Sequence, residues 1–207
     1  MNSTWWRKLS DLDDAQRKFI ELPPDGRFLL IGPPGSGKTN LLLLRAQFIA
    51  GTGEKNVLIV TFTNALADFI RSGIAATKLI SPSQVVTYHS WAAHHIGQHL
   101  GPKAVPALDD FDDECRKQLI AGVQKANKKV PSKKLYSAIF VDEAQDLSVP
   151  ELEALLCLSD KICICGDSHT PSPFPADLRG HAAQRSLLRA VRGCLQPRVL
   201  AGGNGRH

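Results

Sequence analysis

The chain has 207 residues, of which 43% are hydrophobic and 22% are charged, values that are ordinary for a globular protein. This length favours one domain, which can bury enough surface to fold without a metal or a disulfide. No apolar run approaches the roughly 18 residues of a membrane span, and residues 1–10 lack the apolar core of a signal peptide. We therefore exclude a membrane protein, a secreted mini-protein and a disordered chain, and we expect a cytoplasmic monomer without a membrane partner.

The formal net charge of +5 is concentrated at one end of the sequence. Residues 1–170 hold 19 basic and 19 acidic side chains, whereas residues 171–207 hold six arginines and a single acid, Asp177. The net charge is therefore no indication of a nucleic-acid groove in the main body of the protein.

Short apolar runs alternate with longer amphipathic segments along the first 170 residues. The apolar runs predict five strands, at residues 27–31, 57–61, 85–87, 138–141 and 162–165. The longer segments predict six helices, at residues 13–21, 38–50, 64–72, 90–100, 112–126 and 150–158. Strands that are apolar on both faces belong to parallel sheets covered by helices on both sides. The alternation therefore predicts an α/β domain over residues 1–170 with about five parallel strands.

Two stretches depart from this alternation. Residues 101–135 carry an acidic cluster followed by a lysine cluster, and they predict a small, mostly helical insertion. Residues 171–207 are rich in proline and glycine, and their only basic residues are arginines. This composition predicts an irregular basic C-terminal tail that adds no strand to the sheet.

A phosphate-binding loop follows the first predicted strand. Residues 32–39, Gly-Pro-Pro-Gly-Ser-Gly-Lys-Thr, match the pattern Gly-x-x-x-x-Gly-Lys-[Ser/Thr] completely. The glycines let consecutive backbone N–H groups face one phosphate, and the following helix adds its positive end. Lys38 is expected to reach the β- and γ-phosphates, while the Thr39 hydroxyl completes a Mg²⁺ shell. The pattern therefore predicts a P-loop NTPase that binds a nucleoside triphosphate.

Two acids end the fourth predicted strand. Asp142 and Glu143 follow the apolar run 138–141 directly. Asp142 is expected to hold Mg²⁺ through water, and Glu143 to orient or deprotonate the attacking water. An acid that activates water favours hydrolysis over phosphate transfer to a small molecule. We therefore assign catalytic roles to Lys38, Asp142 and Glu143, and metal binding to Thr39 and Asp142.

Several motifs together resemble superfamily 1 DNA helicases of the UvrD/Rep type. Residues 141–146, Val-Asp-Glu-Ala-Gln-Asp, resemble the second motif of that family, and residues 12–17 resemble its N-terminal glutamine motif. Residues 61–65 and 87–91 resemble its two DNA-facing motifs, and residues 163–167 resemble the start of its third motif. The resemblance implies the first RecA-like domain of such a helicase, with ATP and Mg²⁺ as cofactors and single-stranded DNA as partner.

The resemblance also implies the residues of two binding sites. The residues expected to bind ATP, with the first one reading the adenine edge, are Gln16, Gly32, Pro33, Pro34, Gly35, Ser36, Gly37, Lys38, Thr39 and Asn40. The residues expected to contact DNA are Phe62, Thr63, Asn64, Tyr88, His89 and Ser90. Bases of an unpaired strand stack on aromatic rings without sequence preference, which suits the aromatic members of this set.

Structural roles compete with the functional ones for several of these side chains. Trp91 fits a core position as well as a DNA contact, whereas Phe62 fits a DNA contact better than a core position. The lysine cluster at 125–134 fits a solvated helix face better than a DNA contact. His95 and His99 lie one helical turn apart, but two nitrogens do not fill a tetrahedral metal site and no matching cysteine is nearby, so we interpret His94, His95 and His99 as a wet helix face. The cysteines have no Cys-x-x-Cys spacing, and we interpret them as buried thiols without a redox role.

The sequence departs from the helicase pattern in two places. The third motif of the family has Gln three residues after its Asp, where this chain has Thr170, and residues 171–207 contain no second RecA-like domain. We therefore hypothesise a truncated or frame-shifted helicase product whose ATP turnover is weak. The alternatives are a nucleotide- and DNA-binding module without helicase activity, or an unrelated P-loop enzyme such as a nucleotide kinase.

Overall fold

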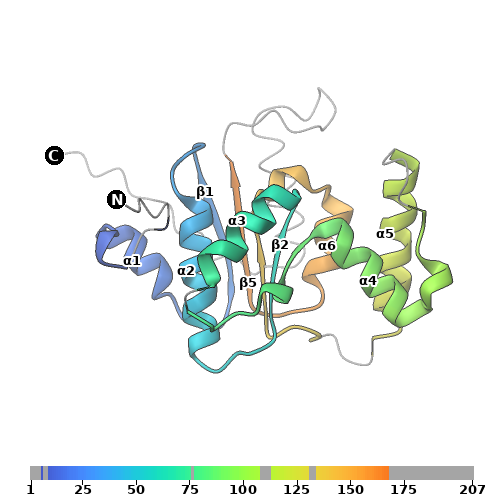
Figure 1. Ribbon diagram of the computed structural model, residues 1–207, viewed down its shortest axis with the longest axis horizontal. Helices are drawn as coiled ribbons and strands as arrows, with labels where there is room; N and C mark the ends of the chain where they lie inside the picture. The colour runs from blue at the N-terminus through green and yellow to red at the C-terminus, as the bar shows by residue number, and fades with distance from the viewer. Residues whose placement is uncertain (1–5, 7–8, 76, 108–112, 131–133, 168–207) are drawn as a thin grey trace.

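The computed structural model describes residues 6, 9–75, 77–107, 113–130 and 134–167 (Figure 1). The predicted C-terminal tail and most of the acidic cluster at 109–114 lie outside these residues.

A five-stranded, all-parallel sheet forms the centre of the domain (Figure 1). Its strands are β1 (Arg27–Gly32), β2 (Val57–Thr61), β3 (Val85–Thr87), β4 (Ala138–Val141) and β5 (Ile162–Asp167). Their order in the sheet is β1-β5-β4-β2-β3, so β5 separates the strand that leads into the glycine-rich loop from the strand that ends in the two acids. The predicted α/β class and the parallel sheet are confirmed.

Six α-helices flank the sheet in the described part of the chain. They are α1 (Asp14–Ile20), α2 (Lys38–Gly51), α3 (Asn64–Ile74), α4 (Tyr88–Leu100), α5 (Asp113–Asn127) and α6 (Val149–Leu156). Short 3₁₀ turns are η1 (Leu9–Asp11), η2 (Pro82–Gln84), η3 (Pro102–Ala104) and η4 (Ala144–Asp146).

Two hydrophobic cores lie on opposite faces of the sheet because successive strand side chains point to opposite sides. On β4, Ala138 and Phe140 pack with α2 and α3, whereas Ile139 and Val141 pack with α4, α5 and α6. Every residue of β2 and β4 is buried. Helices therefore cover both faces, as expected for a three-layer α/β domain.

The predicted insertion at 101–135 is helical where it is described, and its helix belongs to the core. Leu119 and Val123 of α5 are fully buried against α4. At Gly122 of α5, a Cβ would come within 2.6 Å of the end of the Ile96 side chain, so a larger residue there would require Ile96 to shift. Helix α5 thus completes one covering layer.

Buried Arg45 of α2 ties the N-terminal segment to the sheet. Its guanidinium donates to the carbonyls of Ile20 and Pro23, both at 2.6 Å, and to that of Leu22. The Ile20 carbonyl ends α1, and the other two belong to the connection between α1 and β1. The contacts fix α1 beside α2 at the edge of the domain (Figure 1).

No helix in the described ranges is long and apolar enough to cross a membrane.

Candidate functional site

The glycine-rich loop curls from the end of β1 into α2. Gly35 and Gly37 have φ angles of +75° and +83°, a left-handed region that side chains rarely adopt. At Gly32, a Cβ would lie 2.9 Å from the Ser36 hydroxyl, so a side chain there would require Ser36 to shift. Gly37 caps α2 without any side-chain hydrogen bond, which leaves the first backbone N–H groups of the helix for an anion. The loop has the shape that a phosphate group requires.

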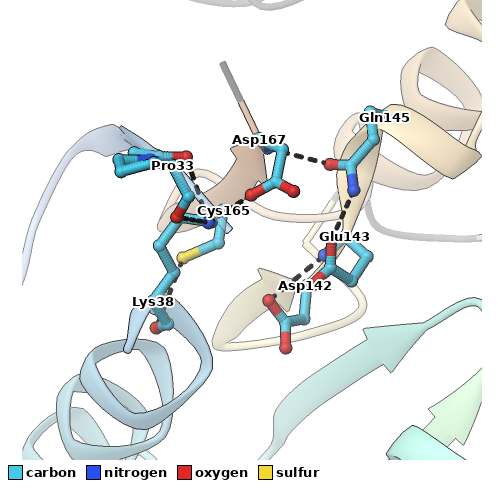
Figure 2. Close-up of polar contacts among 8 residues, drawn as sticks. Pro33, Lys38, Asp142, Glu143, Gln145, Cys165 and Asp167 are labelled. Carbon is cyan, nitrogen blue, oxygen red and sulfur yellow. Dashed lines mark hydrogen bonds and ion pairs between the residues drawn. The ribbon is translucent and has the colours of Figure 1, made fainter. Parts of the chain in front are cut away.

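Lys38 is the buried cation of the site, with only 7% of its side chain exposed. Its ammonium donates to the carbonyls of Gly32 at 3.1 Å and Pro33 at 2.9 Å. A third bond runs to the carboxylate of Asp167 at the end of β5 (Figure 2). The ammonium is therefore held inside the loop by two carbonyls and one acid.

Asp142 stands at the tip of β4 and is 1% exposed. One carboxylate oxygen accepts the Glu143 backbone N–H at 3.1 Å, while the other, Oδ2, is buried without a hydrogen-bond partner. Burial raises the pKa of Asp142 to about 6, and the nearby Thr39 hydroxyl opposes that rise. A buried carboxylate oxygen without a partner, beside a hydroxyl, suits a hard divalent cation. Thr39 and Asp142 thus fit Mg²⁺.

Glu143 has a left-handed backbone, with φ at 50° and ψ at 47°, which is uncommon for a residue with a side chain. Its carboxylate accepts a hydrogen bond from the side-chain amide of Gln145. The Gln145 carbonyl in turn accepts the backbone N–H of Asp167 at 3.1 Å (Figure 2). Asp146 is close enough that Glu143 and Asp167 raise its pKa further, after the larger effect of burial.

The acids, the loop and the lysine meet at one edge of the sheet. Parallel strands end at the same edge, and β1, β4 and β5 deliver Gly32, Asp142 and Asp167 there. The sequence analysis assigned no role to Gln145 or Asp167. Gln145 lies two residues after Glu143 in the sequence, but only the fold brings its second partner, Asp167 of β5, next to it.

Gln16 lies on the first turn of α1, where it forms a capping box with Asp13. The Gln16 N–H donates to the Asp13 carboxylate at 2.8 Å, and the Asp13 N–H donates to the Gln16 side-chain carbonyl at 3.2 Å. Reading an adenine edge would require the side-chain carbonyl to leave this cap or to be shared. Of the other predicted loop residues, Pro33, Pro34 and Ser36 are exposed, and Asn40 is half-buried in α2.

The residues predicted to contact DNA gather at the same edge of the sheet, beyond β2 and β3. Thr63 and Thr87 cap α3 and α4, and the rings of Phe62 and His89 meet edge to face with centroids 5.3 Å apart. Asn64, Thr63 and Ser90 are exposed. The two segments therefore form one surface, with exposed polar groups at two helix starts.

The structure buries three aromatic side chains of this region, of which Tyr88 and His95 were expected to be exposed and Trp91 was left open. Tyr88 is 0% exposed and packed beside Trp91, so in this structure its ring cannot stack on a base. Trp91 is a core residue, and its indole N–H donates to the Tyr136 hydroxyl at 2.9 Å. The wet-face interpretation is wrong for His95, which is buried and bonded to Asn127 at 2.8 Å. The sequence alone does not distinguish an aromatic residue after a strand that faces solvent from one that faces the core.

Arg116 of α5 connects the two regions, and the sequence analysis did not single it out. Its guanidinium is paired with the fully buried carboxylate of Glu151 and donates to the Asp146 carbonyl at 3.0 Å. The same guanidinium lies over the Phe62 ring, 5.9 Å from its centroid. A lone arginine on a predicted insertion helix gives no signal of such contacts.

Among the described residues, no group of three or more His, Cys, Asp or Glu side chains could hold a metal by itself. Cys115, Cys163 and Cys165 are buried, as expected for packing residues, whereas Cys157 is exposed, so the buried interpretation is wrong for it.

A family model described as an AAA domain matches residues 16–174. The matched segment begins at the predicted adenine-reading glutamine and contains every described strand. Comparison with curated proteins gave no significant match.

Proposed function

The chain belongs to the AAA domain family. We propose that it binds Mg-ATP at the sheet edge and hydrolyses it in a DNA-dependent manner. One observation carries the proposal. The phosphate-shaped loop, the buried Lys38, the orphaned oxygen of Asp142 and the Glu143 carboxylate all meet where three parallel strands end.

Each group has a distinct part in the proposed reaction. The loop N–H groups and Lys38 bind the phosphates, and Thr39 and Asp142 hold Mg²⁺, which supplies charge neutralisation when bound. Glu143 orients the attacking water and accepts its proton. Gln16 contacts the adenine, since its amide offers one donor and one acceptor.

The DNA part of the proposal rests on the surface beside β2 and β3. Phe62 is half-buried and braced by His89 and Arg116, which suits a ring that receives one base. Thr63, Asn64 and Ser90 offer polar groups to phosphates at the starts of α3 and α4. We propose single-stranded DNA as the partner, in keeping with the motor domain of a UvrD/Rep-like helicase.

Binding measurements on the full chain test both parts. A fluorescent ATP analogue with Mg²⁺ is expected to bind, and Lys38→Ala is expected to weaken binding at least tenfold. Labelled oligothymidine is expected to bind as well and to raise the ATPase rate. Unchanged analogue binding by Lys38→Ala would contradict the nucleotide site.

A matched pair of phenylalanines tests the DNA surface. Phe62→Ala removes the proposed stacking platform, and base–ring stacking contributes about 1–3 kcal/mol, so affinity for oligothymidine should fall at least fivefold. Phe69→Ala is the control, because Phe69 is 39% exposed on α3 but stacks on Trp6 instead. Equal effects of the two substitutions would remove Phe62 from the proposed DNA site.

A further inference from the structure

The Gln145 side chain uses both ends of its amide within the site. Its NH₂ donates to the Glu143 carboxylate, and its carbonyl accepts the Asp167 backbone N–H at 3.1 Å (Figure 2). Glu143 and Gln145 leave the tip of β4, whereas Asp167 ends β5. A single side chain therefore bridges the acid that would activate water and the strand next to the phosphate-binding loop.

The Asp167 carboxylate is already paired with Lys38, the cation that a triphosphate would need. It pairs with the Lys38 ammonium, and both side chains are at least nine-tenths buried. A bound phosphate and this carboxylate would compete for the same ammonium, since two anions next to one buried cation repel each other. A phosphate at Lys38 would therefore weaken the pairing with the Asp167 carboxylate, and the backbone N–H of the same residue is bonded to Gln145.

Glu143 depends on Gln145 for its orientation. Asp142 and Asp146 flank it, and the like charge of Glu143 contributes to the raised pKa of both. Glu143 also has a left-handed backbone, a conformation that is strained for a residue with a side chain. The Gln145 amide is a donor beside these acids and holds the Glu143 carboxylate in one place.

We propose that Gln145 is a positioning residue for hydrolysis, which transmits the release of Asp167 from Lys38 to the Glu143 carboxylate. The proposal rests on the ATP hydrolysis proposed above. Gln145 then performs a coupling role between the phosphates and the water-activating acid without touching either the nucleotide or the water.

Two substitutions test the hydrogen bonds that Gln145 makes to Glu143 and Asp167. Gln145→Glu keeps an acceptor for the Asp167 N–H but replaces the donor to Glu143 with a second carboxylate, whereas Gln145→Ala removes both bonds. Each is expected to lower kcat at least tenfold while KM for Mg-ATP stays within threefold. Gln98→Glu, on an exposed position of α4, is the control and should leave both constants unchanged.

A measurement without turnover tests the transmission itself. The side-chain amide signals of Gln145 in a ¹⁵N-labelled chain are identified by their absence from Gln145→Glu. Adding a non-hydrolysable ATP analogue with Mg²⁺ is expected to move these signals in the wild type. Asp167→Asn, which weakens the hold on Lys38, should move them in the same direction without any nucleotide.

The outcomes distinguish this proposal from the function on which it rests. Gln145 signals that stay in place when the analogue is bound, or a Gln145→Glu chain with wild-type kcat, would overturn the positioning role alone. A wild-type chain that binds no nucleotide analogue would overturn the proposed function together with it.

Discussion

At the scale of single residues, Glu143 is the group on which hydrolysis should depend most. Glu143→Gln keeps the size and one acceptor oxygen but cannot take a proton from water. We expect turnover to fall about 10²- to 10⁴-fold, the usual contribution of a general base, with little change in nucleotide affinity. Glu153→Gln, at an exposed position of α6, is the control. Steady-state phosphate release and analogue binding measure the two effects, and a parallel loss of affinity would contradict the assignment.

Gln16 combines a structural and a proposed recognition role, which two substitutions separate. Gln16→Ala removes the adenine contact and half of the capping box, whereas Asp13→Ala removes the acceptor that caps α1. Each should lower stability by about 1 kcal/mol. Only Gln16→Ala should erase a preference for ATP over GTP, measured by competition against a fluorescent analogue. A preference that survives Gln16→Ala would exclude the adenine role.

At the scale of elements, Arg45 is expected to hold α1 and its connection in place. Arg45→Met fills a similar volume but leaves three carbonyls without their donor, and each unsatisfied buried group costs about 1–3 kcal/mol. We expect at least about 3 kcal/mol lower stability by urea unfolding. Arg17→Met, on the exposed side of α1, should change stability little. Equal midpoints for the two variants would contradict the role of Arg45.

The packing of α4 on α5 should make stability sensitive to acid. Burial lowers the pKa of His95 below 6.5, and the nearby His99 and His94 add to this effect while the bond to Asn127 opposes it. The unfolded chain then binds the proton more readily than the folded one. Stability is therefore lost as pH falls from about 6.5 towards the lower folded pKa.

His95→Gln tests this because its amide can still donate to Asn127 but does not titrate. Urea midpoints of the variant should fall less than those of the wild type between pH 7 and pH 5. His94→Gln, at an exposed position of the same helix, should reproduce the wild-type slope more closely. A wild-type slope in His95→Gln would show that other groups carry the acid sensitivity.

At the scale of the whole molecule, nucleotide binding should stabilise the fold, because the site is built from strands that unfolding separates. A ligand at 100 times its Kd adds about 2.7 kcal/mol. For a domain of this size that corresponds to a rise in Tm of roughly 5–10 °C. Thermal denaturation with and without Mg-ATP measures the shift, which should disappear in Lys38→Ala. A shift that persists there would place the nucleotide elsewhere.

Much of this architecture could be predicted because local patterns determine it. Three predicted strands agree with the structure to the residue, and the other two are extended at their carboxyl ends, where β5 reaches Asp167. Continuous apolar runs suffice for strands that are buried on both faces. The glycine-rich loop and the paired acids likewise carry their chemistry within a few residues.

What could not be predicted depends on contacts between distant segments. The insertion of β5 between β1 and β4, the burial of Tyr88 and the partnership of His95 with Asn127 arise from packing that no local pattern records. The same is true of Gln145, whose partners lie on different elements. Sequence located the chemistry, and the fold determined which groups act together.

The central place of β5 also bears on when the site comes into being during folding. Lys38 and Asp167 are 129 residues apart in sequence, and β1 pairs with β5 rather than with any strand made earlier. Closing so long a loop is entropically unfavourable, and pairings of this kind form late and slowly. During most of its synthesis, the chain would therefore have its phosphate-binding loop but not β5, the neighbouring strand that completes the site. We therefore expect the protein to gain nucleotide binding in one late step of folding. Folding intermediates without the complete sheet should not bind nucleotide.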